Sequence, residues 1–175
     1  MNQTQLALGG DEGSGAVISP DKLYRYRLWR RWGAGRPVLF VMLNPSTADS
    51  NLNDPTIRRC IGFAMSWGFA ALEVVNLFAL RSPDPNHLKA FGKPGPHVWG
   101  PDNDTHIKEA AEKAAIVVAA WGCNPMVDLR VRHVLDLLQP RGVMCIAKTK
   151  KGYPKHPLYL KKDLAPMPYL GGVRR

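Results

Sequence analysis

The chain has 175 residues, with 24 Lys and Arg against 14 Asp and Glu, which gives a net charge of +10. A hydrophobic share of 45% and a charged share of 22% are typical of a globular domain, and they exclude a disordered, collagen-like or coiled-coil chain. No apolar run approaches the roughly 20 residues of a membrane helix, and the N-terminus shows no signal-peptide pattern. We therefore expect a cytoplasmic protein with no membrane partner.

The cysteines and the net charge narrow the functional classes further. Cys60, Cys123 and Cys145 are an odd, widely spaced set, which excludes a disulfide framework and a four-cysteine metal site. No cluster of His, Asp and Glu has the spacing of metal ligands, so we expect no metal and no cofactor. The positive charge suggests an anionic partner, nucleic acid before an acidic membrane surface, although many basic proteins are merely soluble. We expect a monomer.

The N-terminal third begins with residues 1–15, which are polar and glycine-rich and are expected to form a flexible tail. Residues 16–175 are expected to form a single domain whose basic, proline-rich C-terminal part wraps around it. Residues 16–19 and 24–32 predict a β-hairpin, because large apolar and basic residues alternate along the second segment. The four arginines of that segment would then line its solvent face, either as a solvated edge or as a phosphate-facing strip.

The rest of the chain alternates apolar runs with helical patterns. Continuous apolar runs, typical of strands buried on both faces, occupy residues 37–43, 72–78, 116–121 and 142–147. Helical patterns occupy residues 54–68, 82–91, 103–115 and 126–138, and the first of these helices is predicted to begin with Asp54 as its N-cap and Pro55 at its first position. This alternation predicts an α/β three-layer sandwich with a central four-stranded parallel sheet, to which the N-terminal hairpin is added.

Ligands of open parallel sheets bind beyond the carboxyl ends of the strands. The four segments that follow the predicted strands are residues 44–49, 76–81, 121–125 and 148–157, and all of them carry amide, hydroxyl or basic side chains beside glycine or proline. None begins with a pair of carboxylates. The glycine loops that bind nucleotide phosphates and dinucleotides are absent, and Ser46 lacks the flanking glycines of a nucleophile elbow.

Several of these segments resemble a known bacterial family, the domain-of-unknown-function family 1643. The likeness is carried by residues 40–49, 54–59 and 75–81, with Asp84 and Pro85. It extends through Trp121 and Gly122 to residues 152–158, and so covers residues 16–168 approximately. The resemblance supplies no function by itself.

A more distant resemblance, to the uracil-DNA glycosylase superfamily, does imply a function. That superfamily is also a four-stranded parallel sheet between helices, and its active site lies at the same strand ends. Residues 42–46 resemble the motif of its mismatch-specific branch, in which the asparagine that corresponds to Asn44 positions the attacking water. In the uracil-specific branch, Asn76 corresponds to the amide that reads the base edge, and His156 to the histidine that stabilises the departing base. Trp121 and Gly122 are similar to a Trp-Gly pair of that branch.

The chain also departs from the superfamily. Met42 stands where the first motif has a glycine, about eight extra residues (148–155) precede His156, and the cysteine cluster of the iron–sulfur glycosylases is absent. These departures leave the substrate open.

The resemblance implies a DNA glycosylase that releases a modified or damaged base, with DNA as its partner. Asn44 would orient the water, Asp49 would be a stronger water-activating group, and His156 would donate to the base oxygen. The base would be bound by Asn76, Phe78, Trp121 and Ser46. Phosphates would be bound by Arg58, Arg59, Arg81, Lys148, Lys150, Lys151 and Lys155.

Other interpretations remain open. Asn44 also suits a loop turn, Asn76 and His156 suit structural roles, and Phe78 and Trp121 suit a core. The whole protein could be a non-catalytic nucleic-acid-binding module, or an enzyme acting on a free nucleoside or nucleotide.

Overall fold

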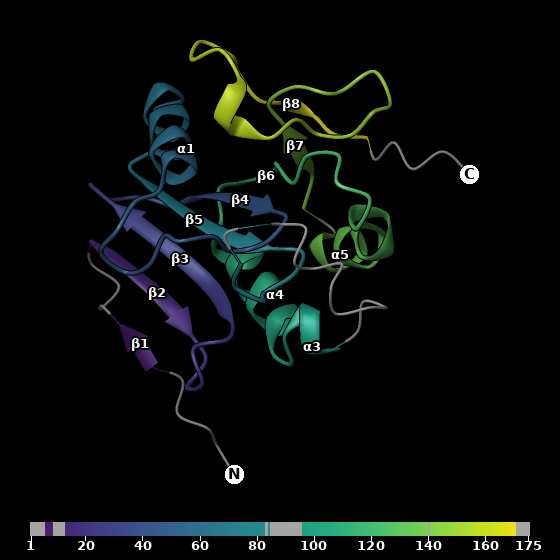
Figure 1. Cartoon of the computed structure of the whole chain (residues 1–175). Helices are drawn as coiled ribbons and strands as arrows, with labels where there is room; N and C mark the ends of the chain where they lie inside the picture. Colours follow the sequence, from purple (N-terminus) through teal and green to yellow (C-terminus); the bar gives the residue numbers. More distant parts are fainter. Residues whose placement is uncertain (1–5, 9–12, 83, 85–95, 140, 171–175) are drawn as a thin grey trace.

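The computed structural model describes residues 6–8, 13–82, 84, 96–139 and 141–170, which form one mixed sheet between helices (Figure 1). The described strands are β1 (Leu6–Leu8), β2 (Ser14–Ile18), β3 (Arg25–Arg31), β4 (Val38–Met42), β5 (Ala71–Asn76), β6 (Ile116–Ala119), β7 (Val143–Cys145) and β8 (Met167–Pro168). The described helices are α1 (Pro55–Ser66), α3 (Pro96–Trp99), α4 (Asn103–Lys113) and α5 (Val131–Leu138), with 3₁₀ turns η1 (Val127–Leu129) and η2 (Pro157–Tyr159).

The α/β class is confirmed, but the sheet is larger than the predicted four strands. The strand order is β1-β2-β3-β5-β4-β6-β7-β8, and the four central strands β5, β4, β6 and β7 are parallel. The predicted N-terminal hairpin, β2 and β3, is part of this sheet because β3 pairs antiparallel with β5. The short strands β1 and β8 extend the two edges, and two or three residues are too few to produce a periodic sequence pattern.

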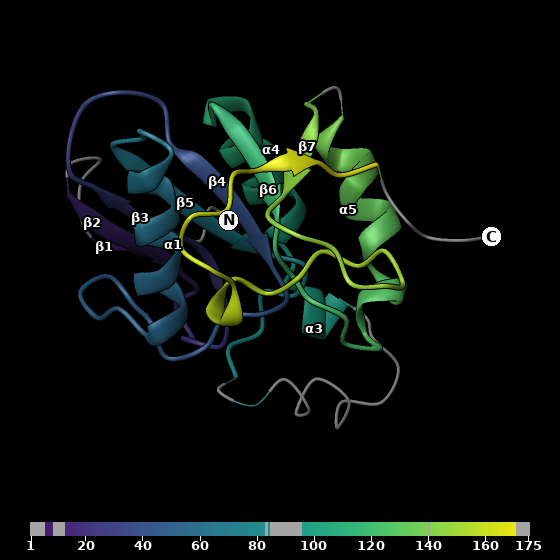
Figure 2. The same cartoon turned by 90° about the horizontal axis from the view of Figure 1, so that it is seen from above.

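Strand β4 lies at the centre, and its side chains alternate between two hydrophobic clusters. Val38 and Phe40 pack with α1 on one face, whereas Leu39 and Val41 pack with α4 and α5 on the other. Figures 1 and 2 show α1 and α4 on opposite faces of the sheet. A strand covered on both faces is apolar at every position, which explains the uninterrupted run in the sequence.

The helix boundaries follow local signals. Asp54 caps α1 by accepting a hydrogen bond from the Ile57 amide at 2.8 Å, and Pro55 occupies the first helical position, as predicted. The prediction of one helix over residues 126–138 is wrong in its first part. A 3₁₀ turn, η1, occupies that part, and α5 begins only after Arg130. The helix predicted over residues 82–91 lies almost wholly outside the described residues.

The expectation that the arginines of β3 line a solvent face is wrong for two of them. Arg25 and Arg30 are only 3% and 5% exposed, because the loop between β4 and α1 covers them. Arg25 donates to the carbonyl oxygen of Ala48, and Arg30 donates to that of Leu52 and to the side chain of Asn53. These bonds hold the loop against the sheet.

The two ends of the chain contribute to the sheet edges. Strand β1 and the start of β2 fall within residues 1–15, which were expected to be a tail. The segment after β7 crosses towards α1, where η2 packs, and returns to β7 as β8 (Figure 2). In the part of the chain that the structure describes, no helix is both long and apolar enough to span a bilayer.

Gly15 provides a test of the hairpin. A Cβ added at Gly15 would overlap the indole ring of Trp29 on the neighbouring strand. We expect Gly15→Ala to lower the free energy of unfolding by about 1–3 kcal/mol, as overpacking does. Gly142→Ala is the control, because nothing lies within 4 Å of that Cβ position. Urea unfolding of both variants measures the difference, and equal stability would contradict the close packing of Trp29 on β2.

Candidate functional site

A cavity of about 350 Å³ lies at the carboxyl ends of the central parallel strands. Chain order reverses around β4, since β5 follows it on one side and β6 and β7 lie on the other, and such a reversal is where ligands bind in open α/β sheets. The lining residues are Arg25, Met42, Leu43, Asn44, Ser46, Asp54, Thr56, Ile57, Asn76, Ser82, Trp121, His156, Leu158 and Tyr159. All four predicted strand-end segments therefore contribute to one site.

Asn44 follows β4 and is oriented by its amide nitrogen. Nδ2 donates to the carbonyl oxygens of Pro45 and Ser82, both at 3.0 Å. Because two carbonyl oxygens require a donor, these bonds identify which amide atom is nitrogen. Among the described residues Oδ1 has no partner, so it is the atom left to accept a hydrogen bond from a molecule in the cavity.

Asn76 ends β5 and is only 1% exposed. Its backbone is held in place, because Nδ2 of Asn103 donates to its carbonyl oxygen at 2.9 Å. Its side chain, in contrast, has both Nδ2 and Oδ1 buried without any hydrogen-bond partner within the described part of the chain. A buried amide with two unsatisfied atoms costs free energy, and a ligand that offers one acceptor and one donor would remove that cost.

His156 reaches the cavity although ten residues separate it from the end of β7. Residues 148–155 form a hairpin turn, in which the amide of Lys155 donates to the carbonyl oxygen of Ala147 at 2.8 Å. Thr149 and Tyr153 are also hydrogen-bonded across the turn, and His156 follows directly. The insertion noted in the sequence therefore leaves the histidine at the strand end.

The environment of His156 fixes one tautomer of its ring. Nδ1 accepts a hydrogen bond from the amide of Leu158 at 3.3 Å, so the proton of the neutral ring is on Nε2. Burial lowers the pKa of His156, and the opposing charge of Asp54 is a smaller effect. The residue thus offers a neutral N–H donor at neutral pH.

We expect the ring of His156 to titrate with a midpoint below 6.5, because burial disfavours its charged form. An NMR titration of the histidine Cε1–H resonances measures this midpoint, with His156→Gln as the variant that assigns the signal. A midpoint at or above 6.5 would show that the ring is not buried in this way.

The same shift has a consequence for stability. An unfolded-state histidine, with a pKa of about 6.5, binds a proton more readily than folded His156, so stability falls as the pH drops below 6.5 and through the lower folded pKa. Burial lowers the pKa of His106 as well, so His156→Gln should flatten this dependence only in part.

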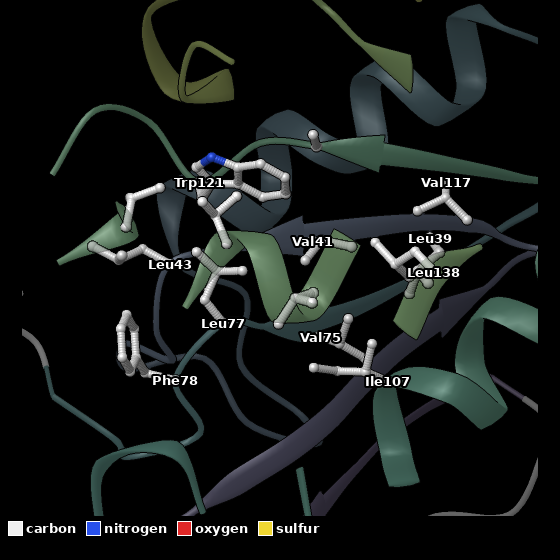
Figure 3. Packing of buried hydrophobic residues seen from close by; sticks show 14 of the residues in the cluster. Leu39, Val41, Leu43, Val75, Leu77, Phe78, Ile107, Val117, Trp121 and Leu138 are labelled. Carbon is white, nitrogen blue, oxygen red and sulfur yellow. The ribbon is translucent and has the colours of Figure 1, made fainter. Parts of the chain in front are cut away.

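The two candidate stacking residues lie in different places. Trp121 follows β6, lines the cavity and is 2% exposed, and its ring packs nearly perpendicular to that of Tyr169 at a centroid distance of 5.7 Å. Phe78 is fully buried in the hydrophobic cluster and does not line the cavity. Figure 3 shows the two rings well apart within that cluster. Only Trp121 is therefore placed to contact a ligand.

The carboxylate that lines the cavity is Asp54, not Asp49. The Oδ1 atom of Asp49 accepts hydrogen bonds from the amides of Asn51 and Leu52, both at 2.9 Å, and these bonds lower the pKa of its carboxyl. Asp49 thus closes a turn in the loop before α1. Asp54 lines the cavity from the N-cap of α1, and its charge acts on both His156 and Arg25.

The predicted phosphate-binding arginines lie outside the cavity. Arg58 and Arg59 line a second hollow of about 360 Å³ beside α1, together with Lys162. The guanidinium of Arg59 lies over the ring of Phe63, 5.2 Å from its centroid. Arg81 is half-buried and donates to the carbonyl oxygen of Lys22.

The four predicted lysines are all exposed, and all lie on the hairpin turn that precedes His156: Lys148, Lys150, Lys151 and Lys155. Ser46 lines the cavity and is half-buried. Within the residues that the structure describes, no group of three or more His, Cys, Asp or Glu could hold a metal ion.

Comparison with known proteins identifies a family but no activity. Residues 25–158 match the family described as a protein of unknown function, DUF1643. The chain belongs to the DUF1643 family. No curated protein and no solved structure matches it.

The region matched to DUF1643 contains every cavity residue except Tyr159, which follows its last residue directly. The cavity is therefore built almost entirely from the part of the chain that defines the family.

Among the cavity residues that the sequence did not assign to the site, Arg25, Asp54 and Tyr159 matter most for its chemistry. Arg25 was assigned to a solvent face by alternation, and Asp54 was interpreted only as a helix cap. Tyr159, 87% exposed at the cavity, is an aromatic residue three positions after His156, which is the one signal that could have identified it.

Proposed function

We propose that the protein is a glycosylase that hydrolyses the N-glycosidic bond of a modified or damaged base in DNA. The observation that supports this proposal best is the meeting of Asn44, Asn76 and His156 in one cavity, where both amide atoms of Asn76 are buried and have no hydrogen-bond partner among the residues that the structure describes. A pyrimidine edge that presents adjacent donor and acceptor groups would satisfy both atoms.

The reaction requires a water on the sugar and a stabilised leaving base. In the proposed reaction, the water oxygen bonds to the anomeric carbon as the carbon–nitrogen bond breaks, and the electron pair of that bond leaves with the base. Asn44 holds the water through Oδ1, and Asp54 accepts its proton. His156 donates from Nε2 to the base oxygen on which negative charge develops.

The surroundings of the cavity suit an extruded base. Trp121 and apolar side chains such as Leu43 and Ile57 form part of its lining, which offsets the cost of removing a base from the stack. Tyr159 presents an exposed ring on which a neighbouring base could stack. The exposed lysines of residues 148–155 precede His156 and would bind phosphates without sequence preference.

The test is incubation of the protein with single- and double-stranded oligonucleotides that carry uracil, oxidised pyrimidines or hypermodified pyrimidines. Chromatography then measures the release of free base. We expect release from at least one of them, and its loss in Asn44→Ala and His156→Ala while DNA binding survives. Binding without any release would support a non-catalytic module. Release from free nucleotides alone, unchanged when the lysines are neutralised, would support a nucleotide hydrolase.

A further inference from the structure

Arg25 brings a buried positive charge to the cavity. Its side chain is 3% exposed and lines the cavity from the first position of β3. One guanidinium nitrogen, Nη1, donates to the carbonyl oxygen of Ala48 at 2.6 Å, whereas Nε is buried and has no partner among the described residues. Arg25 also forms no ion pair with any residue that the structure describes. The carboxylates of Asp54 and Asp49 act on this charge through space without forming an ion pair with it, so an anionic ligand in direct contact would be its counter-ion.

The first turn of α1 faces the same cavity. Thr56 and Ile57 line it, and the N-terminus of a 12-residue helix favours negative charge. Ser46 and Thr56 also line the cavity, and their hydroxyl groups are possible hydrogen-bond donors to an anion. The negative charge of Asp54 would repel an anion in the cavity, but its Oδ1 atom already accepts a hydrogen bond from the amide of Ile57.

We propose that the cavity binds the phosphate group of the same nucleotide whose base Asn76 binds, with Arg25 and the first turn of α1 as the phosphate-binding groups. This inference rests on the proposed function, in which Asn76 binds the base, and it adds the phosphate as a second point of contact with the same ligand. A free nucleotide and a nucleotide extruded from DNA share this chemistry. Arginine suits the role because its planar guanidinium matches the geometry of phosphate oxygens.

Calorimetric titration of the whole protein tests the proposal with four probes: inorganic phosphate, deoxyuridine, deoxyuridine 5′-monophosphate and a short oligonucleotide that contains deoxyuridine. We expect the monophosphate or the oligonucleotide to bind at least tenfold more tightly than deoxyuridine. This advantage, and the binding of inorganic phosphate, should disappear in Arg25→Met and be partly kept in Arg25→Lys.

Asp54→Asn keeps the test decisive if Arg25→Met fails to fold. Asparagine caps a helix as well as aspartate does, so this variant should fold, and the loss of a negative charge should tighten phosphate binding severalfold. Weaker phosphate binding in Asp54→Asn would overturn the proposal. So would equal affinity of the wild type for deoxyuridine and both phosphate-bearing probes, or phosphate binding that survives in folded Arg25→Met.

The four probes distinguish a free nucleotide from a DNA strand as the ligand, and the Arg25→Met variant distinguishes the phosphate site from the proposed glycosylase activity. Arg25-dependent binding of the monophosphate alone indicates a free nucleotide, and Arg25-dependent binding of the oligonucleotide indicates a DNA strand; both support the phosphate site. Arg25-dependent phosphate binding without base release would contradict the glycosylase activity and support the phosphate site. Base release that is unchanged in Arg25→Met would contradict the phosphate site and support the glycosylase activity.

Discussion

Asn76→Leu is expected to abolish base release and yet leave the protein as stable as the wild type, or more stable by about 1 kcal/mol. Leucine has nearly the shape of asparagine, and the two amide atoms that it removes have no partner among the described residues. Their removal therefore breaks no hydrogen bond and relieves the cost of burying them. A side chain kept for ligand binding at the expense of stability behaves in this way.

Asn103→Leu is the matched control for this experiment. Asn103 is equally buried, but its Nδ2 donates to the carbonyl oxygens of Asn76 and Leu77 at 2.9 and 3.3 Å. We expect its loss to lower the free energy of unfolding by about 1–3 kcal/mol, because two hydrogen bonds are lost and only the Leu77 carbonyl oxygen keeps another side-chain donor, Nε of Arg130. Urea unfolding and base release are measured for both variants. Equal destabilisation by the two changes would indicate that Asn76 has a structural role.

Asp54→Asn is expected to lower the rate of base release by about a thousandfold, a typical loss for a general base. Its free energy of unfolding should change by less than about 0.5 kcal/mol, because asparagine can accept the same hydrogen bond from Ile57. The experiment thus separates the chemistry of the carboxylate from its role as a helix cap. Single-turnover kinetics on the oligonucleotide that releases base measure the rate.

Asp49→Asn is the control, since Asn can also accept the hydrogen bonds from Asn51 and Leu52 that close this loop. We expect base release by Asp49→Asn to stay within about threefold of the wild type, since Asp49 does not line the cavity. The reverse result, a large loss in Asp49→Asn and none in Asp54→Asn, would restore Asp49 as the water-activating group.

The parallel core was predictable because burial on both faces leaves a clear pattern. The runs that became β4 and β5 are apolar at most positions, and the asparagines that the sequence singled out are Asn44, which follows the first run, and Asn76, which ends β5. Chain topology then brings Asn44 and Asn76 together, since parallel strands end at the same edge. Local composition and one general rule were sufficient for this half of the site.

The other features of the site depend on contacts between segments that are distant in the sequence. Nothing near Arg25 in the sequence shows that the loop before α1 covers it, and an alternating pattern assigned it to solvent. Phe78 follows Asn76 so closely that the sequence could not separate a cavity residue from a core residue. The sequence marked Asp54 as a helix cap, but only the folded chain shows that Asp54 lines the cavity whereas Asp49 accepts hydrogen bonds that close a turn of the loop.

The hairpin of residues 148–155 starts and ends at the same place, because the Lys155 amide is bonded to the Ala147 carbonyl oxygen. Its length and its lysines can therefore change in evolution while His156 keeps its position at the strand end. On the proposed function, substitutions in this hairpin would therefore change the affinity for DNA without changing the chemistry of the cavity. If the protein is a glycosylase as proposed, substitutions in this segment should alter its affinity for DNA, and substitutions at Asn44, Asn76 or His156 should alter the reaction.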